Sequence, residues 1–162
     1  QAASQLNFPF HLTIAGGEEK TSSVTRTGYI NELTQLTKQL NLENKVTFVG
    51  KKTPLELKTI YQSAEIFVYP SLYENFGQPL LEAAAHGLPL ISTSVGIARD
   101  IIIEGETGFQ ISGKPEEIKE RIESLRNSNL RLQMGRRIQN EVKDRFDWKN
   151  IMDQYMNLYR SL

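Results

Sequence analysis

Short apolar runs alternate along the chain with segments whose apolar residues recur at helical spacing. Bounded by glycine, proline or polar residues, the apolar runs predict strands at residues 10–15, 45–50, 66–69, 88–92 and 108–112. The periodic segments predict helices at residues 29–40, 54–63, 77–86, 97–104, 115–126, 130–146 and 148–160, with a helix tail at 1–7. This alternation predicts an α/β fold with a doubly wound parallel sheet and a helical C-terminal tail.

Several helix boundaries carry explicit sequence signals. The segment Thr53-Pro54-Leu55-Glu56 is a capping box with proline at the first helical position. Gly87 stands where a left-handed residue closes a helix, and Asp147 is a predicted N-cap. Gly135 is the expected place for a bend in the helix of residues 130–146, and the polar loop at 18–28 is expected to be the most mobile segment.

The segment at residues 66–92 is predicted to be one strand–helix–strand unit, and its helix carries an unusual carboxylate. Glu82 is flanked by Leu80, Leu81, Ala83 and Ala84, so it is predicted to stand among residues that face the sheet. A carboxylate there costs several kcal/mol unless it is paired or faces a ligand crevice.

A second carboxylate lies in the loop that precedes this helix. Glu74 follows the carboxyl end of a predicted parallel strand, the place where open α/β sheets bind ligands. Asn75, Phe76 and Gly77 lead into the helix N-terminus, whose N–H groups and positive dipole end bind anions. A phosphate at the helix start, with carboxylates receiving hydroxyls on either side, is the chemistry of a sugar nucleotide.

The stretch from Pro70 to Pro89 strongly resembles the donor-site signature of the group 1 (family 4) retaining glycosyltransferases. Their pattern is a Pro-Ser start, Glu-x-Phe-Gly, a second Glu eight positions after the first, and Ala-x-Gly-x-Pro. The resemblance extends from about His11 to the C-terminus. The sequence from Ala83 to Pro89 is similar to that of the sucrose-phosphate synthase branch. It implies the Rossmann-like C-terminal half of a GT-B fold, whose last helix crosses back to the other domain.

The resemblance also implies a role for each matched residue. Glu82 would accept hydrogen bonds from the ribose hydroxyls. Glu74, the candidate catalytic residue, would hold hydroxyls of the transferred sugar and stabilise positive charge near its anomeric carbon. No residue is an evident general base, and the family mechanism has the departing phosphate take the proton of the acceptor. The remaining donor-binding candidates are Gly16, Gly17, Asn75, Phe76, Gly77 and Leu81.

Structural interpretations stand beside these functional ones. Phe76 is equally a candidate core aromatic, and Gly16 and Gly17 also fit the simple end of a strand. Glu74 and Glu82 are alternatively solvated surface acids, although their spacing favours function. His86 lies on the last helical turn, where capping of the negative dipole end is favoured over catalysis.

Four further positions need interpretation: two lysines have both a structural and a functional interpretation, and two residues differ from the family pattern. Lys51 and Lys52 follow a predicted strand, where surface solvation is the favoured interpretation and phosphate or nucleobase contact the alternative. Ile97 stands where the family usually has the second glycine of a pair, so its side chain is expected to narrow the pocket. Asp100 stands where the family often has glutamate, and is interpreted as a helix-start acid.

Composition excludes several other classes of function. The 162 residues include 19 basic and 19 acidic side chains, so no general attraction to nucleic acid or to a membrane surface is expected. There is no cysteine, which excludes disulfides and thiolate metal sites. No apolar run approaches the roughly 20 residues of a membrane span. No Asp-x-Asp motif occurs, which agrees with the family resemblance, and that resemblance implies no metal or other cofactor. A cytoplasmic location is expected, with membrane attachment through a further domain left open.

By length the chain is predicted to be a single nucleotide-sugar-binding domain over residues 1–162. It lacks the first strand of the family's donor domain, its Gly-Arg and Lys-Gly segments and the acceptor domain. It is therefore expected to be part of a two-domain transferase and inactive alone, its partners being the nucleotide-sugar donor and the N-terminal acceptor domain. The alternatives are a non-catalytic nucleotide-sugar-binding module and another GT-B enzyme such as an epimerase, which the spacing of Glu74 and Glu82 disfavours.

Overall fold

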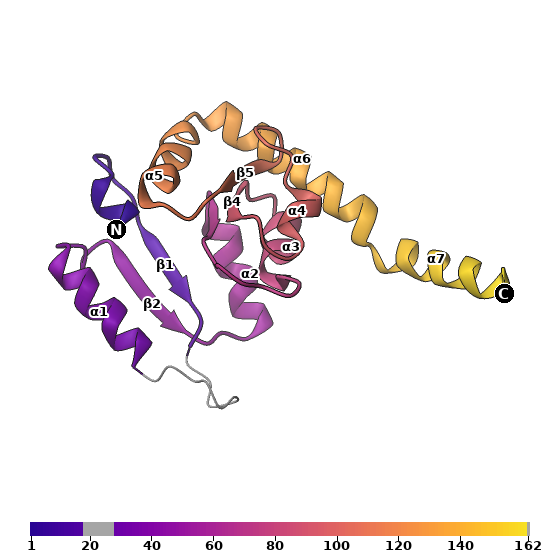
Figure 1. Ribbon diagram of the computed structural model, residues 1–162, viewed down its shortest axis with the longest axis horizontal. Coiled ribbons are helices and arrows are strands. Elements are labelled where there is room, and N and C mark those ends of the chain that lie inside the picture. The colour runs from indigo at the N-terminus through magenta and orange to yellow at the C-terminus, as the bar shows by residue number, and fades with distance from the viewer. Residues whose placement is uncertain (18–27, 162) are drawn as a thin grey trace. The chain divides into compact units, whose positions relative to one another are not determined.

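The computed structural model describes residues 1–17 and 28–161, which group into two compact units (Figure 1). The first unit is Gln1–Thr59 and the second is Ile60–Leu162. Most of the predicted polar loop at 18–28 lies outside the described residues. The prediction of one domain over the whole chain stays a prediction, and each unit is described by itself below.

The first unit contains a two-stranded parallel sheet. Its elements are a 3₁₀ turn (Ala2–Gln5), β1 (Leu12–Ala15), α1 (Tyr29–Gln39), β2 (Val46–Gly50) and the start of α2 (Pro54–Ser63). Leu12 of β1 lies opposite Val46 of β2, so these strands confirm the predicted parallel pairing. The predicted helix tail at residues 1–7 is wrong in type, because only one short 3₁₀ turn forms there.

The predicted capping box at the start of α2 is formed. The Thr53 N–H donates to Glu56 Oε2 at 2.8 Å, and the Glu56 N–H donates to Thr53 Oγ1 at 3.4 Å. The hydrogen bond from the Thr53 backbone is the main reason that the pKa of Glu56 is lowered to about 2. Glu56 also pairs with Lys52 at 3.1 Å, which supports the surface interpretation of that lysine.

The second unit contains a three-stranded parallel sheet in the order β3-β4-β5. Its elements are β3 (Phe67–Tyr69), α3 (Gln78–Ala85), β4 (Leu90–Thr93), α4 (Ala98–Ile101), β5 (Gly108–Ile111), α5 (Pro115–Ser124), α6 (Ser128–Phe146) and α7 (Trp148–Arg160). β4 is central and buried along its whole length, as its apolar run predicts. The predicted α/β class with parallel strands is confirmed, although the hydrogen-bonded strands form two sheets rather than one.

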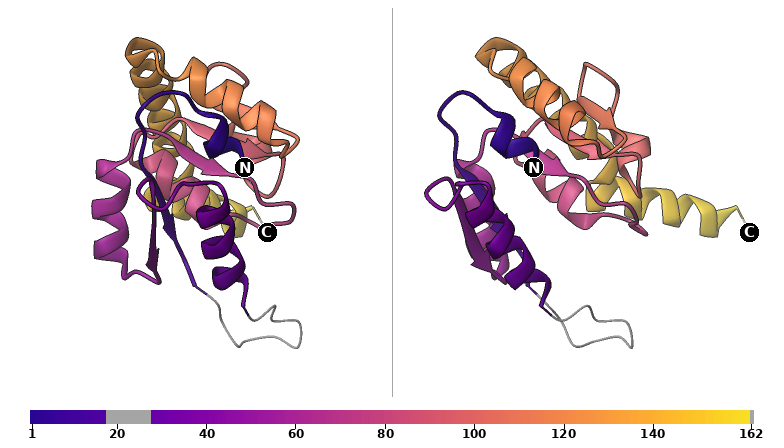
Figure 2. Two further views of the ribbon diagram at one scale, coloured as in Figure 1. Left: turned by 90° about the vertical axis from the view of Figure 1, so that its left-hand side faces the viewer. Right: turned by 60° about the vertical axis from the view of Figure 1, so that its left-hand side comes forward.

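Helices cover the sheet of the second unit (Figure 2). α5 packs on β4 and β5, and α3 lies against β3, β4 and α6. A core cluster lies between the sheet and these helices, formed by Ile91, Phe109, Ile111, Leu125 and Met134. This packing leaves the carboxyl ends of β3 and β4, with the loops that follow them, as the part of the unit where the predicted site residues gather.

Gly135 serves a close helix contact. α6 continues through Gly135 without interruption, and a Cβ at this position would lie 2.1 Å from the Gly87 carbonyl oxygen. Gly87 has φ +74° and closes α3 as predicted. Gln139 Nε2 donates to the Ala85 carbonyl at 2.8 Å and ties the same two elements together. Glycine is therefore required here for a close approach.

Two further boundaries test the predictions. The predicted helix at 97–104 is too long, because α4 ends at Ile101 and Thr107 Oγ1 holds the next turn by donating to the Ile101 carbonyl at 2.8 Å. The predicted N-cap Asp147 is confirmed, since its carboxylate accepts from the Lys149 N–H at 2.9 Å.

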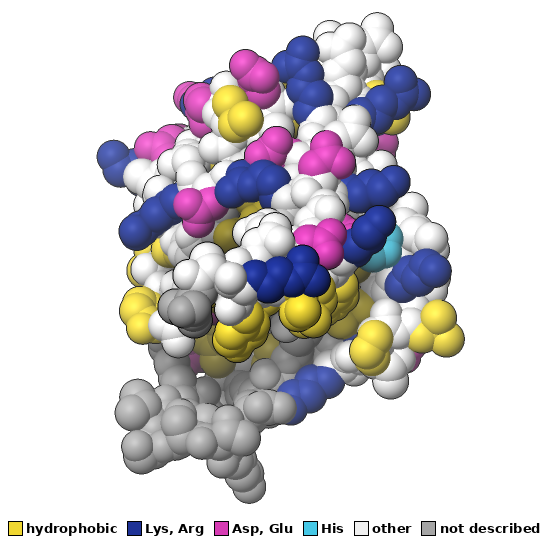
Figure 3. Space-filling model, turned by 90° about the vertical axis from the view of Figure 1, so that its right-hand side faces the viewer, with side chains coloured by type: hydrophobic (Ala, Val, Ile, Leu, Met, Phe, Trp, Pro, Cys, Tyr) yellow, Lys and Arg dark blue, Asp and Glu magenta, His cyan; other side chains and the backbone are white. Residues whose placement is uncertain are grey.

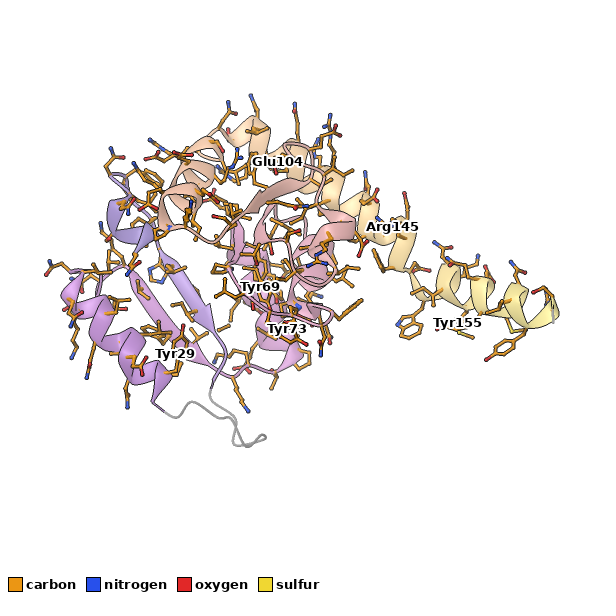
Figure 4. All side chains as sticks on the ribbon, viewed as in Figure 1. Tyr29, Tyr69, Tyr73, Glu104, Arg145 and Tyr155 are labelled. Atoms are coloured by element: carbon orange, nitrogen blue, oxygen red, sulfur yellow. The ribbon has the colours of Figure 1, made fainter. Side chains whose placement is uncertain are left out.

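α7 carries an exposed apolar stripe. It contacts α6, and Figure 1 shows it continuing away from the sheet of the second unit. Tyr155 projects from it into solvent (Figure 4). Its exposed large side chains are Trp148, Met152, Tyr155, Met156, Leu158 and Tyr159.

The charged surface is mixed in sign. On the face shown in Figure 3, Lys and Arg lie interspersed with Asp and Glu, and exposed hydrophobic side chains occur between them. Within residues 1–17 and 28–161, no helix is long and apolar enough to cross a membrane.

Candidate functional site

A pocket of about 590 Å³ lies at the carboxyl ends of β3 and β4. One wall is the loop between β3 and α3, and the other is the loop after β4 together with the first residues of α4. The lining residues are Leu72, Tyr73, Glu74, Asn75, Phe76, Val95, Gly96, Ile97, Arg99 and Asp100. The pocket thus brings the predicted residues Glu74, Asn75 and Phe76 next to the loop that carries the unusual Ile97.

Two hydrogen-bond donors hold the carboxylate of Glu74. The Tyr69 hydroxyl donates to its Oε2 at 2.6 Å, and the Asn75 N–H donates to its Oε1 at 3.0 Å. The backbone N–H groups of Phe76 and Gly77 also favour the charged form of this carboxylate. The anion at the start of α3 in this structure is therefore the carboxylate of Glu74 itself.

These donors set the protonation states of both partners. The Tyr69 hydroxyl, followed by the backbone N–H groups, lowers the pKa of Glu74 although partial burial opposes the shift. Burial, followed by the hydrogen bond to Glu74, raises the pKa of Tyr69 to about 12. At neutral pH Glu74 is therefore an oriented anion and Tyr69 a protonated donor.

The two walls of the pocket are locked together at Gly96. The Ile97 N–H donates to the Phe76 carbonyl at 2.7 Å. A Cβ at Gly96, which has φ +47°, would lie 2.4 Å from the same carbonyl oxygen. The side chain of Phe76 is 50% exposed, so the interpretation of Phe76 as a core aromatic is wrong. Ile97 lines the pocket, and only 8% of its surface is exposed. Gly77, with φ +87°, is buried and serves as the N-cap of α3.

The second candidate carboxylate, Glu82, lies on α3. Its Oε2 accepts from the Tyr61 hydroxyl at 3.1 Å, and its Oε1 accepts from Gln78 Nε2 at 3.1 Å. The helix buries Leu80, Ala83 and Ala84, while Glu82 is half-buried. The prediction that Glu82 faces the sheet is therefore wrong, because helical periodicity turns it toward α2 on the flank of the buried face.

An aromatic group surrounds this second carboxylate. Tyr61 stacks on His86 with ring centroids 5.2 Å apart, and its ring meets Phe67 edge to face at 5.9 Å. Burial, with the charge of Glu82 beside it, raises the pKa of Tyr61. His86 Nδ1 lies 2.7 Å from the Glu82 carbonyl oxygen, which supports the predicted capping role of His86.

The remaining predicted residues lie at other places. Gly16 and Gly17 follow β1 in the first unit, where the Gly16 N–H donates to the Gly50 carbonyl at 2.9 Å. A Cβ at Gly17 would lie 3.1 Å from Cγ of Lys51, so both belong to the carboxyl ends of that sheet. Leu81 is half-buried on α3, and Asp100 lines the pocket instead of acting only as a helix-start acid.

Sequence reasoning missed five polar residues around the pocket and the two carboxylates, namely Tyr61, Tyr69, Tyr73, Gln78 and Arg99. Tyr69 and Tyr73, labelled in Figure 4, come from the end of β3 and the loop after it, and the Tyr73 hydroxyl donates to Asn75 Oδ1 at 2.8 Å. Arg99 lines the pocket, and its Nε donates to the Ser94 carbonyl at 2.8 Å. The position of Tyr69 at a strand end, five residues before Glu74, was a usable signal, whereas nothing local connects Tyr61 with Glu82.

Comparison with known proteins identifies the family to which this sequence is similar. Residues 1–141 match the family of group 1 glycosyl transferases. The chain is 31% identical to the D-inositol 3-phosphate glycosyltransferase of Corynebacterium urealyticum, over 100% of this chain and 39% of that protein. It is 32% identical to the N-acetyl-alpha-D-glucosaminyl L-malate synthase of Bacillus anthracis, over 77% of this chain and 33% of that protein.

Solved structures also superpose on this chain. The sucrose-phosphate synthase of Thermosynechococcus elongatus superposes with a TM-score of 0.86 at 29% identity, over 99% of this chain and 40% of that chain. The Anabaena protein HepE in complex with UDP superposes with a TM-score of 0.89 over 99% of this chain and 43% of that chain, at 23% identity. At this sequence identity, the similarity to HepE supports a shared fold and nothing further.

The chain therefore belongs to the group 1 glycosyltransferase family and has the fold of the C-terminal domain of a GT-B glycosyltransferase. It spans about two fifths of the length of the first relative and one third of the length of the second. The family resemblance and the fold predicted from the sequence are confirmed.

Proposed function

We propose that this chain binds a nucleotide sugar, and that the intact protein transfers the sugar to an acceptor hydroxyl with retention of anomeric configuration. The observation that carries the proposal is the pair of oriented carboxylates on α3 and on the loop before it. Glu74 is held ionised by Tyr69 and three backbone N–H groups, and Glu82 is held by Tyr61 and Gln78. Fixed carboxylates of this kind suit hydroxyl recognition and developing positive charge.

In the proposed reaction Glu74 acts at the transferred sugar. Its carboxylate lines the pocket, and its lowered pKa keeps it charged when the bond to the diphosphate breaks. An oxocarbenium-like transition state gains more from such a carboxylate than the neutral sugar does, so the interaction favours turnover. We propose that the departing phosphate accepts the acceptor's proton on the same face, which accounts for retention without a separate protein base.

We propose UDP as the carrier of the sugar. Crystal structures of the Anabaena protein HepE, which has the same fold, contain UDP, UDP with glucose, or UDP-glucose. In this proposal the ribose lies at Glu82, and Asn75, Phe76 and Gly77 are donor-binding residues of the loop that carries Glu74 and of the start of α3. Gly16, Gly17 and Leu81 are proposed as further donor contacts.

We also propose that a further domain of the intact protein supplies the acceptor site. Support comes from the relatives, of which this chain matches only 33–39% of the length. The exposed apolar stripe of α7 is the surface we assign to contact with that domain, because Trp148, Tyr155 and Tyr159 are each more than half exposed. Transfer by the intact protein, measured with UDP-glucose and related donors, tests whether it is an enzyme or a non-catalytic binding module.

Replacing Glu82 with glutamine is expected to weaken the binding of UDP to the intact protein. A carboxylate that accepts two ribose hydroxyls makes charge-assisted bonds that an amide only half replaces, so the expected loss is about 1.5–3 kcal/mol. Calorimetric titration with UDP measures it. Glu120→Gln, at an exposed position on α5, is the matched control. Equal affinities of Glu82→Gln and the unmodified protein would assign Glu82 to the surface.

A further inference from the structure

We infer that Tyr61 is a positioning residue that presents the carboxylate of Glu82 to the two neighbouring hydroxyls of a ribose. The inference rests on the proposed function, because it assumes that a nucleotide binds at Glu82. It adds a residue from α2, twenty-one positions before Glu82, to the recognition of the donor.

The phenol of Tyr61 is held rigidly beside the carboxylate. Tyr61 is 8% exposed, and its ring is confined by stacking on His86 and by the edge contact with Phe67. His86 is in turn tied to the Glu82 carbonyl through its Nδ1. The Tyr61 hydroxyl therefore has few alternative positions, and its hydrogen bond at 3.1 Å restricts the rotamer of Glu82.

The hydrogen bonds of Glu82 leave room for a diol. An ionised carboxylate offers about four acceptor positions, two on each oxygen. Tyr61 takes one position on Oε2, and Gln78 takes one on Oε1. One acceptor position therefore remains on each of the two carboxylate oxygens. Two vicinal hydroxyls, such as those on C2 and C3 of a ribose, match this arrangement.

A purely structural role for Tyr61 makes a different prediction. A buried tyrosine hydroxyl usually needs a hydrogen-bond partner, and Glu82 could be no more than that partner. In that case, removing the hydroxyl would affect the binding of every nucleotide equally or not at all. If Tyr61 positions Glu82 for the ribose, its removal affects only those nucleotides that carry the two hydroxyls.

The test compares Tyr61→Phe with the unmodified intact protein by calorimetric titration. The nucleotides are UDP, GDP and ADP, and the tightest binder is compared with its 2′,3′-dideoxy counterpart. Tyr61→Phe is expected to weaken the ribonucleotide by about tenfold, the effect of one hydrogen bond to a charged group. The dideoxynucleotide is expected to change by less than about twofold, because it makes no contact with Glu82. Tyr29→Phe, at a position on α1 that is 46% exposed, is the control and leaves both affinities unchanged.

A second variant keeps the test independent of the folding of Tyr61→Phe. Gln78→Met removes the other donor to Glu82 from an exposed position at the start of α3, and the same selective loss is expected. Equal losses for the ribonucleotide and the dideoxynucleotide, or no loss for either, would overturn the inference while the proposed function stands. Failure of the unmodified protein to bind any of the three nucleotides would overturn both.

Discussion

Replacing Glu74 with glutamine is expected to lower the turnover of the intact protein by about 100-fold or more, the scale of losing one well-placed electrostatic partner. Tyr69 and the N–H groups at the start of α3 already hold the carboxylate in place and lower its pKa. Its charge therefore meets the developing positive charge of the sugar without reorganisation. The amide keeps the size of the side chain but removes that charge.

Steady-state kinetics with saturating donor measure this effect, and Glu120→Gln again serves as the control. Because the pKa of Glu74 lies below the ordinary value of 4.5, the carboxylate stays ionised as the pH falls toward 4.5. Protonation of Glu74 should therefore not lower turnover in this range. If turnover of Glu74→Gln stays within a few-fold and only the Michaelis constant rises, Glu74 is a binding residue and the catalytic assignment is wrong.

Replacing Gly96 with alanine is expected to destabilise the second unit by about 2–4 kcal/mol and to weaken donor binding. The new Cβ would lie 2.4 Å from the Phe76 carbonyl oxygen and 3.3 Å from Cγ of Glu74. A side chain at φ +47° adds about 1 kcal/mol of backbone strain, and overpacking adds about 1–3 kcal/mol. The loop that carries Glu74 must then move away from the loop after β4.

The variant Gly105→Ala distinguishes the effect of the steric clash at Gly96 from the effect of backbone strain at a positive φ. Gly105 also has a positive φ, +75°, but a Cβ there meets nothing within 4 Å. Its replacement is expected to cost only about 1 kcal/mol and to leave the affinity for UDP unchanged. Urea unfolding and calorimetric titration of both variants provide the comparison. Similar results for the two glycines would show that the contact between the pocket walls contributes nothing to the site.

Features determined by neighbours along the chain were predictable from the sequence. The capping box at Thr53 and the N-cap at Asp147 depend on side chains that reach backbone groups two or three residues away. Gly87 closes α3 because a left-handed residue is needed there, whatever packs around it. The buried strand β4 and the position of Glu74 at a strand end follow equally from local pattern. Of these features, Glu74 and Gly87 belong to the family signature at residues 70–89.

Features that join segments distant in the sequence were decided only by the tertiary structure. Tyr61 meets Glu82, and the Gly96 loop meets the Phe76 carbonyl, because helices and loops from different parts of the chain pack against one sheet. The close approach of Gly135 to Gly87 replaced the expected bend for the same reason. Periodicity indicates which face of a helix is buried, but the partner that each side chain meets depends on how the elements pack in three dimensions.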